Sequence, residues 1–278
     1  RSTIQTPPPP VAVAHLSACS DRVKVASFNV NSVRARLANV TEWLDAFKPD
    51  IVCLQEIKAQ DETFPFADLE AAGYHATIVG QKSYNGVAIL SREPVVTRLH
   101  ALPGDEEDDH ARYIEVETSE GFIVGGLYLP NGNPVPGPKF DYKLSWMDRL
   151  IRHAGELLTT EQPFVLCGDY NVIPTDADVY SPTAMKDDAL GRPESKDRLY
   201  TLLNMGLTDT FRVFDERPGQ FSYWDYQRGA YDKDHGWRID FILASPQVAD
   251  RLVGAGIDRT PRPKEKASDH TPVWAEFS

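Results

Sequence analysis

The chain has 278 residues, of which 41% are hydrophobic, with a formal net charge of −12 and three cysteines. This length and composition allow a sizeable core within one large domain, and no apolar run approaches the roughly 20 residues that a membrane-spanning helix needs. Three cysteines, with Cys53 and Cys167 in predicted core strands, provide no disulfide framework and indicate a reducing compartment; no Cys/His cluster has the spacing of a zinc site.

The first residues differ in composition from the rest. The run Thr6-Pro-Pro-Pro-Pro10 predicts a disordered proline-rich tail over residues 1–20, with one catalytic domain over 21–278. Leu16-Ser-Ala-Cys19 has the shape of a bacterial lipoprotein cleavage site. The apolar run before it is short and interrupted by His15, so we do not expect a lipid anchor on Cys19.

Along the rest of the chain, apolar strand patterns alternate with helical ones. The strands are predicted at 22–29, 51–54, 86–90, 113–117, 122–128, 163–167, 237–243 and 273–277. Helices are predicted at 37–47, at 142–158 and around Leu199, Leu202 and Leu203, the last ending at Gly206. This mixture predicts an α/β fold in which two sheets are covered by helices.

Five short polar clusters stand at the edges of these strands. They are Asn29, Glu56, Asp169 with Asn171, Asp240, and Asp269 with His270. If the final strand runs antiparallel to the others, all five share one rim of the fold. Carboxylates, amides and an imidazole without cysteine are the groups that a hard divalent cation and a phosphate ester require.

Each cluster alone is more typical of a turn or a solvated edge. The turn interpretation has to hold at five places at once, however, and Asp240 falls within an apolar strand, where an unpaired carboxylate is costly. The conjunction therefore favours a site.

Metal-assisted phosphodiester hydrolysis assigns a role to each cluster. Glu56 is predicted to be the chief ligand of Mg²⁺, with Asn29 and Asp269 beside it. Asp169 is predicted to activate the attacking water, and Asn171 to hold the water or the phosphate.

The remaining polar groups are assigned to the phosphate. His270, paired with Asp240, would be charged against it. Tyr128 ends a strand, and its hydroxyl either binds phosphate or assists the leaving group; simple packing at a strand end is an equal alternative.

A second pattern concerns the substrate. Between Phe221 and Arg238 aromatic residues alternate with cations, as on surfaces that stack on bases or sugars. The net charge argues against a nucleic-acid partner, but five of the acids lie in 105–109 and basic residues flank Asn29 and precede Asp269. Phosphate contact near the rim is therefore compatible with the composition.

These residues together resemble the exonuclease III family of apurinic/apyrimidinic endonucleases, within the endonuclease/exonuclease/phosphatase superfamily. The motifs that carry the resemblance are Ser27-Phe-Asn-Val-Asn-Ser-Val-Arg-Ala-Arg36, Leu54-Gln-Glu-Ile-Lys58, Tyr84-Asn-Gly-Val-Ala-Ile-Leu90, Tyr128-Leu-Pro-Asn131, Gly168-Asp-Tyr-Asn171, Trp237-Arg-Ile-Asp240 and Ser268-Asp-His-Thr-Pro272. The resemblance implies a DNase I-like four-layer α/β-sandwich, with two packed, mainly antiparallel sheets flanked by helices.

It also implies an activity: Mg²⁺- or Mn²⁺-dependent cleavage of double-stranded DNA at abasic sites and damaged 3′ ends, by a monomeric base-excision-repair enzyme of the bacterial cytoplasm. Metal binding is implied for Asn29, Glu56 and Asp269, and phosphate or water handling for Tyr128, Asp169, Asn171, Asp240 and His270. We expect substrate contacts from Asn131, Arg112, Tyr223, Trp224, Trp237, Arg238, Ile239 and Tyr180.

One segment departs from the best-known members. Residues 172–183 and 188–195 look more like a bacterial branch in which some enzymes favour 3′-end processing, and Tyr180 would narrow the entrance. The alternatives are therefore a 3′-end-processing enzyme with weak abasic-site incision, a phosphodiesterase of the same superfamily that acts on small phosphate esters, and a non-catalytic DNA-binding relative.

Overall fold

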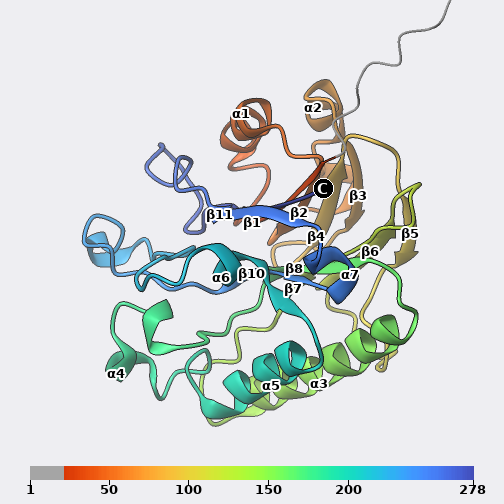
Figure 1. The fold of residues 1–278 in the computed structure, drawn as a ribbon. Coiled ribbons are helices and arrows are strands. Elements are labelled where there is room, and N and C mark those ends of the chain that lie inside the picture. Colours follow the sequence, from red (N-terminus) through yellow and green to blue (C-terminus); the bar gives the residue numbers. More distant parts are fainter. Residues whose placement is uncertain (1–21) are drawn as a thin grey trace, which may run out of the picture.

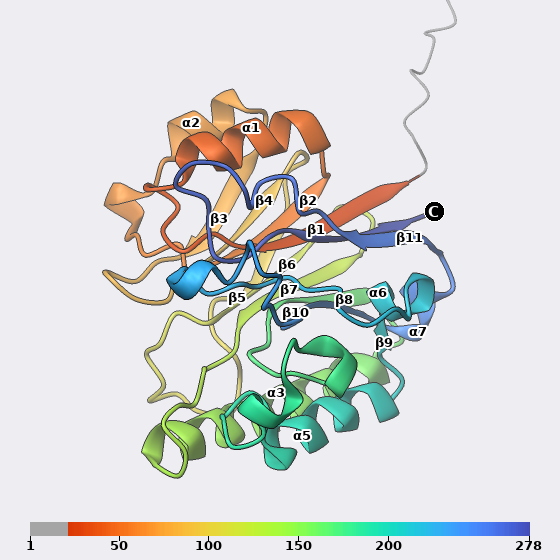
Figure 2. The same ribbon diagram turned by 90° about the vertical axis from the view of Figure 1, so that its left-hand side faces the viewer.

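A computed structural model describes residues 22–278 of the chain. Two six-stranded sheets pack face to face, and helices cover the outer face of each (Figure 1). In the view turned by 90°, α1 and α2 lie on one side of the sheet pair and α3 and α5 on the other (Figure 2). The predicted four-layer α/β-sandwich is confirmed.

The first sheet has the strand order β11-β12-β1-β2-β4-β3. Its strands are β1 (Val23–Asn29), β2 (Ile51–Gln55), β3 (His75–Val79), β4 (Val87–Ser91), β11 (Leu252–Ile257) and β12 (Val273–Phe277). Only β1 and β2 pair parallel in it. Because β12 pairs antiparallel with β1, the start of β12 lies beside the end of β1.

The second sheet has the order β5-β6-β7-β8-β10-β9. Its strands are β5 (Val96–Leu99), β6 (Tyr113–Glu117), β7 (Ile123–Tyr128), β8 (Phe164–Asp169), β9 (Thr208–Asp209) and β10 (Asp240–Ala244). Here β7 and β8 are the parallel pair and the other pairs are antiparallel, so both sheets are mainly antiparallel, as expected.

The helices differ in length and in position. They are α1 (Leu37–Phe47), α2 (Phe66–Ala71), α3 (Pro138–Thr159), α4 (Pro182–Met185), α5 (Pro193–Asn204), α6 (Thr210–Phe214) and α7 (Pro246–Ala249). Helix α1 has the predicted bounds and ends where Lys48 adopts a left-handed φ of 52° before Pro49. Among the described residues, no helix has the length and apolarity to cross a membrane.

Apolar side chains fill the three gaps between the four layers. Val25, Ile51 and Cys167 belong to the cluster between the two sheets. Phe28 packs with Trp43 of α1 on the outer face of the first sheet, and α3 and α5 close the outer face of the second. The free cysteines Cys53 and Cys167 are both buried, whereas Cys19 lies outside the described residues.

The predicted strand over 237–243 needs a correction, because β10 begins only at Asp240. Before that point, Trp237 makes isolated bridges to Val179 and Tyr223, and the Arg238 amide donates to the Asp178 carbonyl. The backbone of Trp237 and Arg238 thus forms hydrogen bonds with neighbouring loops and not with a strand of the sheet. Asp240 is the first residue of a strand and does not lie inside one. Short or polar edge strands such as β5 and β9 escaped the sequence patterns.

Candidate active site

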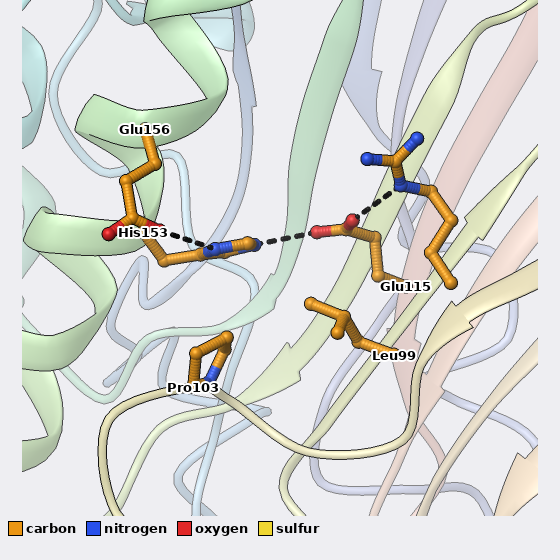
Figure 3. Close-up of a pocket in the computed structure, with 6 residues that line it drawn as sticks. Leu99, Pro103, Glu115, His153 and Glu156 are labelled. Atoms are coloured by element: carbon orange, nitrogen blue, oxygen red, sulfur yellow. Dashed lines mark hydrogen bonds and ion pairs between the residues drawn. The ribbon is translucent and has the colours of Figure 1, made fainter.

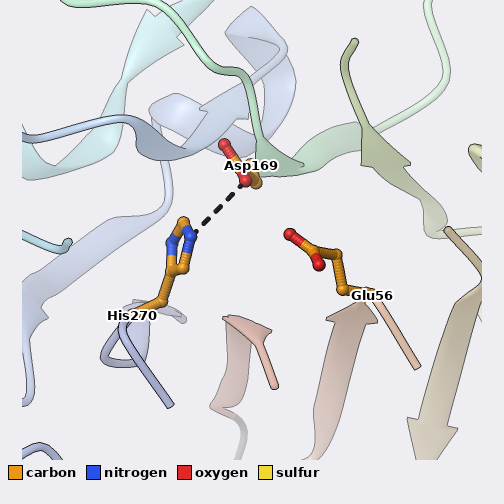
Figure 4. Close-up of side chains that lie close together, drawn as sticks. All are labelled: Glu56, Asp169 and His270. Atoms are coloured by element: carbon orange, nitrogen blue, oxygen red, sulfur yellow. Dashed lines mark ion pairs between the residues drawn. The ribbon is translucent and has the colours of Figure 1, made fainter. Parts of the chain in front are cut away.

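The strand ends meet at one rim between the two sheets. Parallel pairing of β1 and β2 sets Asn29 opposite Gln55, so Glu56 follows beside it. Antiparallel pairing of β8 and β10 places Asp169 directly opposite Asp240. His270 precedes β12, and its side chain points with those of Glu56 and Asp169 into one space (Figure 4). The predicted convergence of the five clusters is confirmed.

Glu56 sits on a turn that holds an unusual backbone conformation. Its φ is 49°, in the left-handed region that side-chain-bearing residues seldom adopt. Its carbonyl accepts from the Ser32 amide at 2.7 Å, and the next amide, of Ile57, donates to Gly86 at 3.2 Å. Such strain costs about 1–2 kcal/mol and persists where surrounding contacts enforce it, commonly at functional sites.

Asn29 joins the two sheets. Its Nδ2 donates to Glu56 Oε1 and to Asp169 Oδ2, each at 3.0 Å, while its Oδ1 accepts from the Asn31 amide at 3.1 Å. In this orientation the amide nitrogen, not the oxygen, faces the carboxylates. Asn29 therefore acts here as a donor that orients them, which differs from its predicted part as an oxygen ligand.

One group of side chains can hold a metal ion. Ligand atoms of Glu56, Asp169 and His270 all lie within 4.8 Å of one another, and this is the one such His/Cys/Asp/Glu group found in 22–278. Two carboxylates fit a hard divalent cation. Asp269, a predicted ligand, is not in this group; its Oδ1 accepts from Asn31 Nδ2 at 3.1 Å instead.

His270 is held by a buried carboxylate. Its Nδ1 lies 2.9 Å from Asp240 Oδ2, and Ser222 Oγ donates to the same oxygen at 2.6 Å. Its Nε2 lies 3.7 Å from Asp169 Oδ2. Burial alone would lower the pKa of His270, but Asp240 and Asp169 outweigh it and raise that pKa. The imidazole is therefore a cation that aims Nε2 into the site, with Asp240 as its partner. In that state it has no lone pair for a metal, which leaves Glu56 and Asp169 as the ligands that this group offers.

Asp169 has the environment of a general base. Its Oδ1 accepts from the Asn171 amide at 2.9 Å and its Oδ2 from Asn29. Burial raises the pKa of Asp169, His270 counteracts this, and the charges of Asp240 and Glu56 add to it. A nearby divalent cation would favour the ionised form.

Lys58, a residue outside the predicted set, balances the charge of Glu56, and Asn31, also outside that set, holds the lysine. Lys58 Nζ lies 2.9 Å from Glu56 Oε2 and donates to Asn31 Oδ1 at 2.6 Å. Burial would raise the pKa of Glu56, yet the hydrogen bonds from Asn29 and Lys58 lower it. Asn31 and Lys58 stand in motifs already noted, but their contacts depend on the turn geometry, which the sequence pattern does not contain.

Tyr128 and the two asparagines border the same rim. The Arg112 guanidinium lies over the Tyr128 ring at 4.8 Å. Burial raises the pKa of Tyr128, and the charges of Glu56 and Asp169 raise it further, so its hydroxyl stays a proton donor. Asn131 Nδ2 donates to Asn171 Oδ1 at 3.3 Å, which joins the loops that follow β7 and β8.

A row of aromatic rings leads outward from His270. Tyr223 meets it edge-on at 4.8 Å, and Trp237 stacks on Tyr223 at 4.8 Å. Tyr180, which is partly exposed, stacks on His235 with centroids 4.4 Å apart. These rings can meet a substrate.

Three residues predicted to contact substrate lie in the interior instead. Trp224 and Ile239 are buried in apolar clusters. Arg238 is 1% exposed and binds Asp178 Oδ1 at 2.6 Å and Asp209 Oδ2 at 2.7 Å. All three are residues of the interior, and their side chains are too buried to contact a substrate directly.

A second polar network lies away from this rim, beside a cavity of about 470 Å³ (Figure 3). His153 Nε2 of α3 lies 2.7 Å from Glu115 Oε2 of β6, which also accepts from Tyr113 Oη at 2.7 Å. Arg98 Nε donates to Glu115 Oε1 at 2.9 Å. These contacts tie α3 to the second sheet.

Comparisons with known proteins agree with this geometry. The model of the endonuclease/exonuclease/phosphatase family matches residues 26–270. The chain is 35% identical to exodeoxyribonuclease III of Haemophilus influenzae over 271 residues, which cover 92% of this chain and all of that protein.

Solved structures give the same result. An AP endonuclease from Archaeoglobus fulgidus superposes with a TM-score of 0.87 at 37% identity, covering 92% of this chain and 99% of that one. The 3′ phosphatase NExo from Neisseria, bound to a product DNA hairpin, has a TM-score of 0.87 at 36% identity, with the same coverage. The chain thus belongs to the endonuclease/exonuclease/phosphatase family and, within it, to the exonuclease III group.

Proposed function

We propose that the protein is a metal-dependent DNA-repair phosphodiesterase that incises abasic sites, degrades DNA from 3′ ends and removes 3′ blocking groups. The observation that carries this proposal is the convergence of Glu56, Asp169 and His270, with ligand atoms within 4.8 Å, at the rim between the sheets. The similarity to exodeoxyribonuclease III, an AP endonuclease and a 3′ phosphatase supports it.

In this proposal each side chain has one task. Bound Mg²⁺ or Mn²⁺ would neutralise charge on the phosphate and acidify water. Asp169, held by Asn29 and by the Asn171 amide, accepts the proton of the attacking water. His270, charged beside Asp240, donates Nε2–H to a phosphate oxygen.

The leaving oxygen needs a proton, and Tyr128 is the group we assign to it. Its raised pKa keeps the hydroxyl protonated until the leaving group becomes basic. Asn171 and Asn131, joined at 3.3 Å, present amides to the same phosphate.

A narrower function is the second candidate: an enzyme that chiefly processes 3′ ends. The observation that favours it is the stacking of Tyr180 on His235, beside the aromatic row. Rings packed together at this position restrict the entry of an extruded abasic sugar. The chain has similar sequence identity to an AP endonuclease and to a 3′ phosphatase, so overall similarity does not favour either activity. The loops around the site are what would determine the preferred DNA lesion. A phosphodiesterase of small phosphate esters is the less favoured reading.

We further propose a monomer that acts on duplex DNA in the bacterial cytoplasm. The two described cysteines, Cys53 and Cys167, are free and buried, as is usual in a reducing compartment.

The test uses labelled duplexes that carry an abasic site, a 3′ phosphate, a mismatch or an intact recessed end, with Mg²⁺, with Mn²⁺ and with EDTA. Asp169→Asn keeps the shape and removes the base, so it should bind DNA and cut none of the four. Most of the activity surviving in that variant would refute the role of Asp169. Faster turnover of a soluble phosphomonoester than of any duplex would refute the choice of DNA.

A further inference from the structure

A lysine is buried in α3, one of the helices that pack on the outer face of the second sheet. Lys143 of α3 is 0% exposed, although lysine is among the residues least often found fully buried. Its Nζ donates to the carbonyl oxygens of Asn131 at 3.0 Å and of Asn171 at 2.5 Å. Burial lowers the pKa of Lys143, while Asp169 and Asp188 oppose that change. Burying an amino group is costly unless it is hydrogen-bonded, so the two carbonyls that accept from Nζ indicate which loops Lys143 holds in place.

The acceptors belong to the two loops that carry the amide pair of the site. Asn131 follows β7 and Asn171 follows β8, and their side chains already meet at 3.3 Å. Asn171 has a φ of 48°, a conformation that needs support from outside its own residue. Its Nδ2 also donates to the Leu129 carbonyl at 2.9 Å. Lys143 thus joins, through their backbone carbonyls, the two residues to which the proposed function assigns the phosphate.

The lysine stem and the first loop fit closely. Gly132, next to Asn131, has a φ of 93°, and a Cβ built on it would lie 2.6 Å from Lys143 Cδ. Only glycine therefore lets the loop pass this close to the stem. The close contact between Gly132 and the lysine stem limits the positions that Nζ can occupy.

The same helix offers a matched residue. Arg149, also buried, donates to the carbonyls of Leu102 at 2.5 Å and Pro103 at 3.1 Å, and it pairs with Asp108 at 2.7 Å. It is a buried cation of α3 that holds Leu102, Pro103 and Asp108, and none of these three residues belongs to the proposed site. Arg149 therefore separates the effect of holding a loop in general from that of holding the site loops.

We propose that Lys143 is a positioning residue of the catalytic site: the hydrogen bonds from its Nζ fix the backbones of Asn131 and Asn171, so that their amides can face the phosphate. This inference rests on the phosphodiesterase function proposed above. Lys143 touches no reacting atom and acts through the two asparagines.

Lys143→Met keeps most of the stem and removes the donors. Turnover is measured on a 3′-phosphate duplex and on bis(p-nitrophenyl) phosphate, which reports phosphodiester cleavage whatever the natural substrate. We expect kcat to fall about 100-fold, the loss typical of a misplaced catalytic group, with KM for DNA within about twofold. Arg149→Met, measured beside it, should lose comparable thermal stability and keep the wild-type kcat.

A double-mutant cycle gives the readout that a merely structural role would not move. In an Asn171→Ala background, Lys143→Met should add little to the loss, because the amide it positions is gone. Lys143→Gln, which keeps N–H donors on a shorter side chain, should fall between Met and wild type.

Three results would overturn the proposal: a wild-type kcat in Lys143→Met, losses that simply multiply in the double variant, or an equal loss of kcat in Arg149→Met. Failure of both Lys143 variants to fold, where Arg149→Met folds, would also overturn it, by assigning Lys143 to stability alone. An inactive wild type on every duplex would instead refute the DNA function, and the ratios on bis(p-nitrophenyl) phosphate would still decide the role of Lys143.

Discussion

The pairing of His270 with Asp240 gives the sharpest single test of the site. Asp240→Asn is nearly isosteric, and an amide oxygen can occupy the place of Oδ2, which lies 2.9 Å from His270 Nδ1 and accepts from Ser222 Oγ at 2.6 Å. Both hydrogen bonds can then persist, so the substitution removes chiefly the negative charge beside the imidazole.

The expected loss follows from what that charge supports. A buried hydrogen bond to a charged group contributes about 1.5–3 kcal/mol, and each 1.4 kcal/mol in a barrier is a factor of ten. If His270 acts on the phosphate as a cation, kcat should fall about 10- to 150-fold. DNA affinity should change little, because the Asp240 side chain is buried and does not itself contact DNA.

The assay is single-turnover cleavage of a 3′-phosphate duplex at saturating enzyme, with DNA affinity measured separately in EDTA. Glu115→Gln is the matched control, because Glu115 is also a buried carboxylate that binds a histidine, His153, at 2.7 Å, and its other partners, Arg98 and Tyr113, do not belong to the site. That control should lose stability and keep the cleavage rate. Equal rates in Asp240→Asn and wild type, or equal losses in the two variants, would refute the assignment.

Three further predictions address the metal, the pH dependence and the lesion. Glu56→Gln should raise the Mg²⁺ concentration for half-maximal rate about tenfold or more, and an unchanged Mg²⁺ titration would remove Glu56 from the metal site. Burial would raise the pKa of Glu115, but hydrogen bonds from His153, Tyr113 and Arg98 lower it, so its contribution is present above the unfolded pKa near 4.5 and is lost as pH falls through the folded pKa. Urea unfolding should therefore show Glu115→Gln about 3 kcal/mol less stable than wild type at pH 7, with a gap that shrinks below pH 4.5; a constant gap would contradict this. Tyr180→Ala should open the wall at His235 and raise abasic-site incision about tenfold relative to 3′-phosphate removal, and an unchanged ratio would show that Tyr180 does not select the lesion.

The meeting of the site residues was predictable because each one follows or precedes an apolar strand. Runs such as Ile51–Gln55 and Phe164–Asp169 are fully buried, so the existence of these strands is marked clearly in the sequence, although β8 continues through Gly168 to Asp169, two residues past its predicted end. Because β12 runs antiparallel to β1, the polar residues that precede β12 lie beside the end of β1. Strand order and pairing beyond that rim needed the structure.

The contacts of charged side chains were much harder to predict. Arg238 stands in a run of aromatics and cations that is typical of a binding surface, yet Asp178, 60 residues earlier, and Asp209 neutralise it in the interior. Lys143 had a usable sign: it shares a helix face with the buried residues Met147 and Leu150, at spacings of four and seven. A lysine at an apolar position of that face indicates a buried partner, but not which one.

The site exists only where the two sheets are packed together. Asn29 and Glu56 come from the first sheet and Asp169 from the second, and the Asn29–Asp169 hydrogen bond joins residues 140 positions apart. Stacked sheets lie about 10 Å apart, a gap that side chains from both rims can span. His270 crosses it in the other direction, from the start of β12 to Asp240 of β10. The proposed metal ligand Glu56 follows a strand of one sheet, and the proposed base Asp169 ends a strand of the other. The distance between them is therefore set by the apolar core between the sheets, and not by either loop on its own.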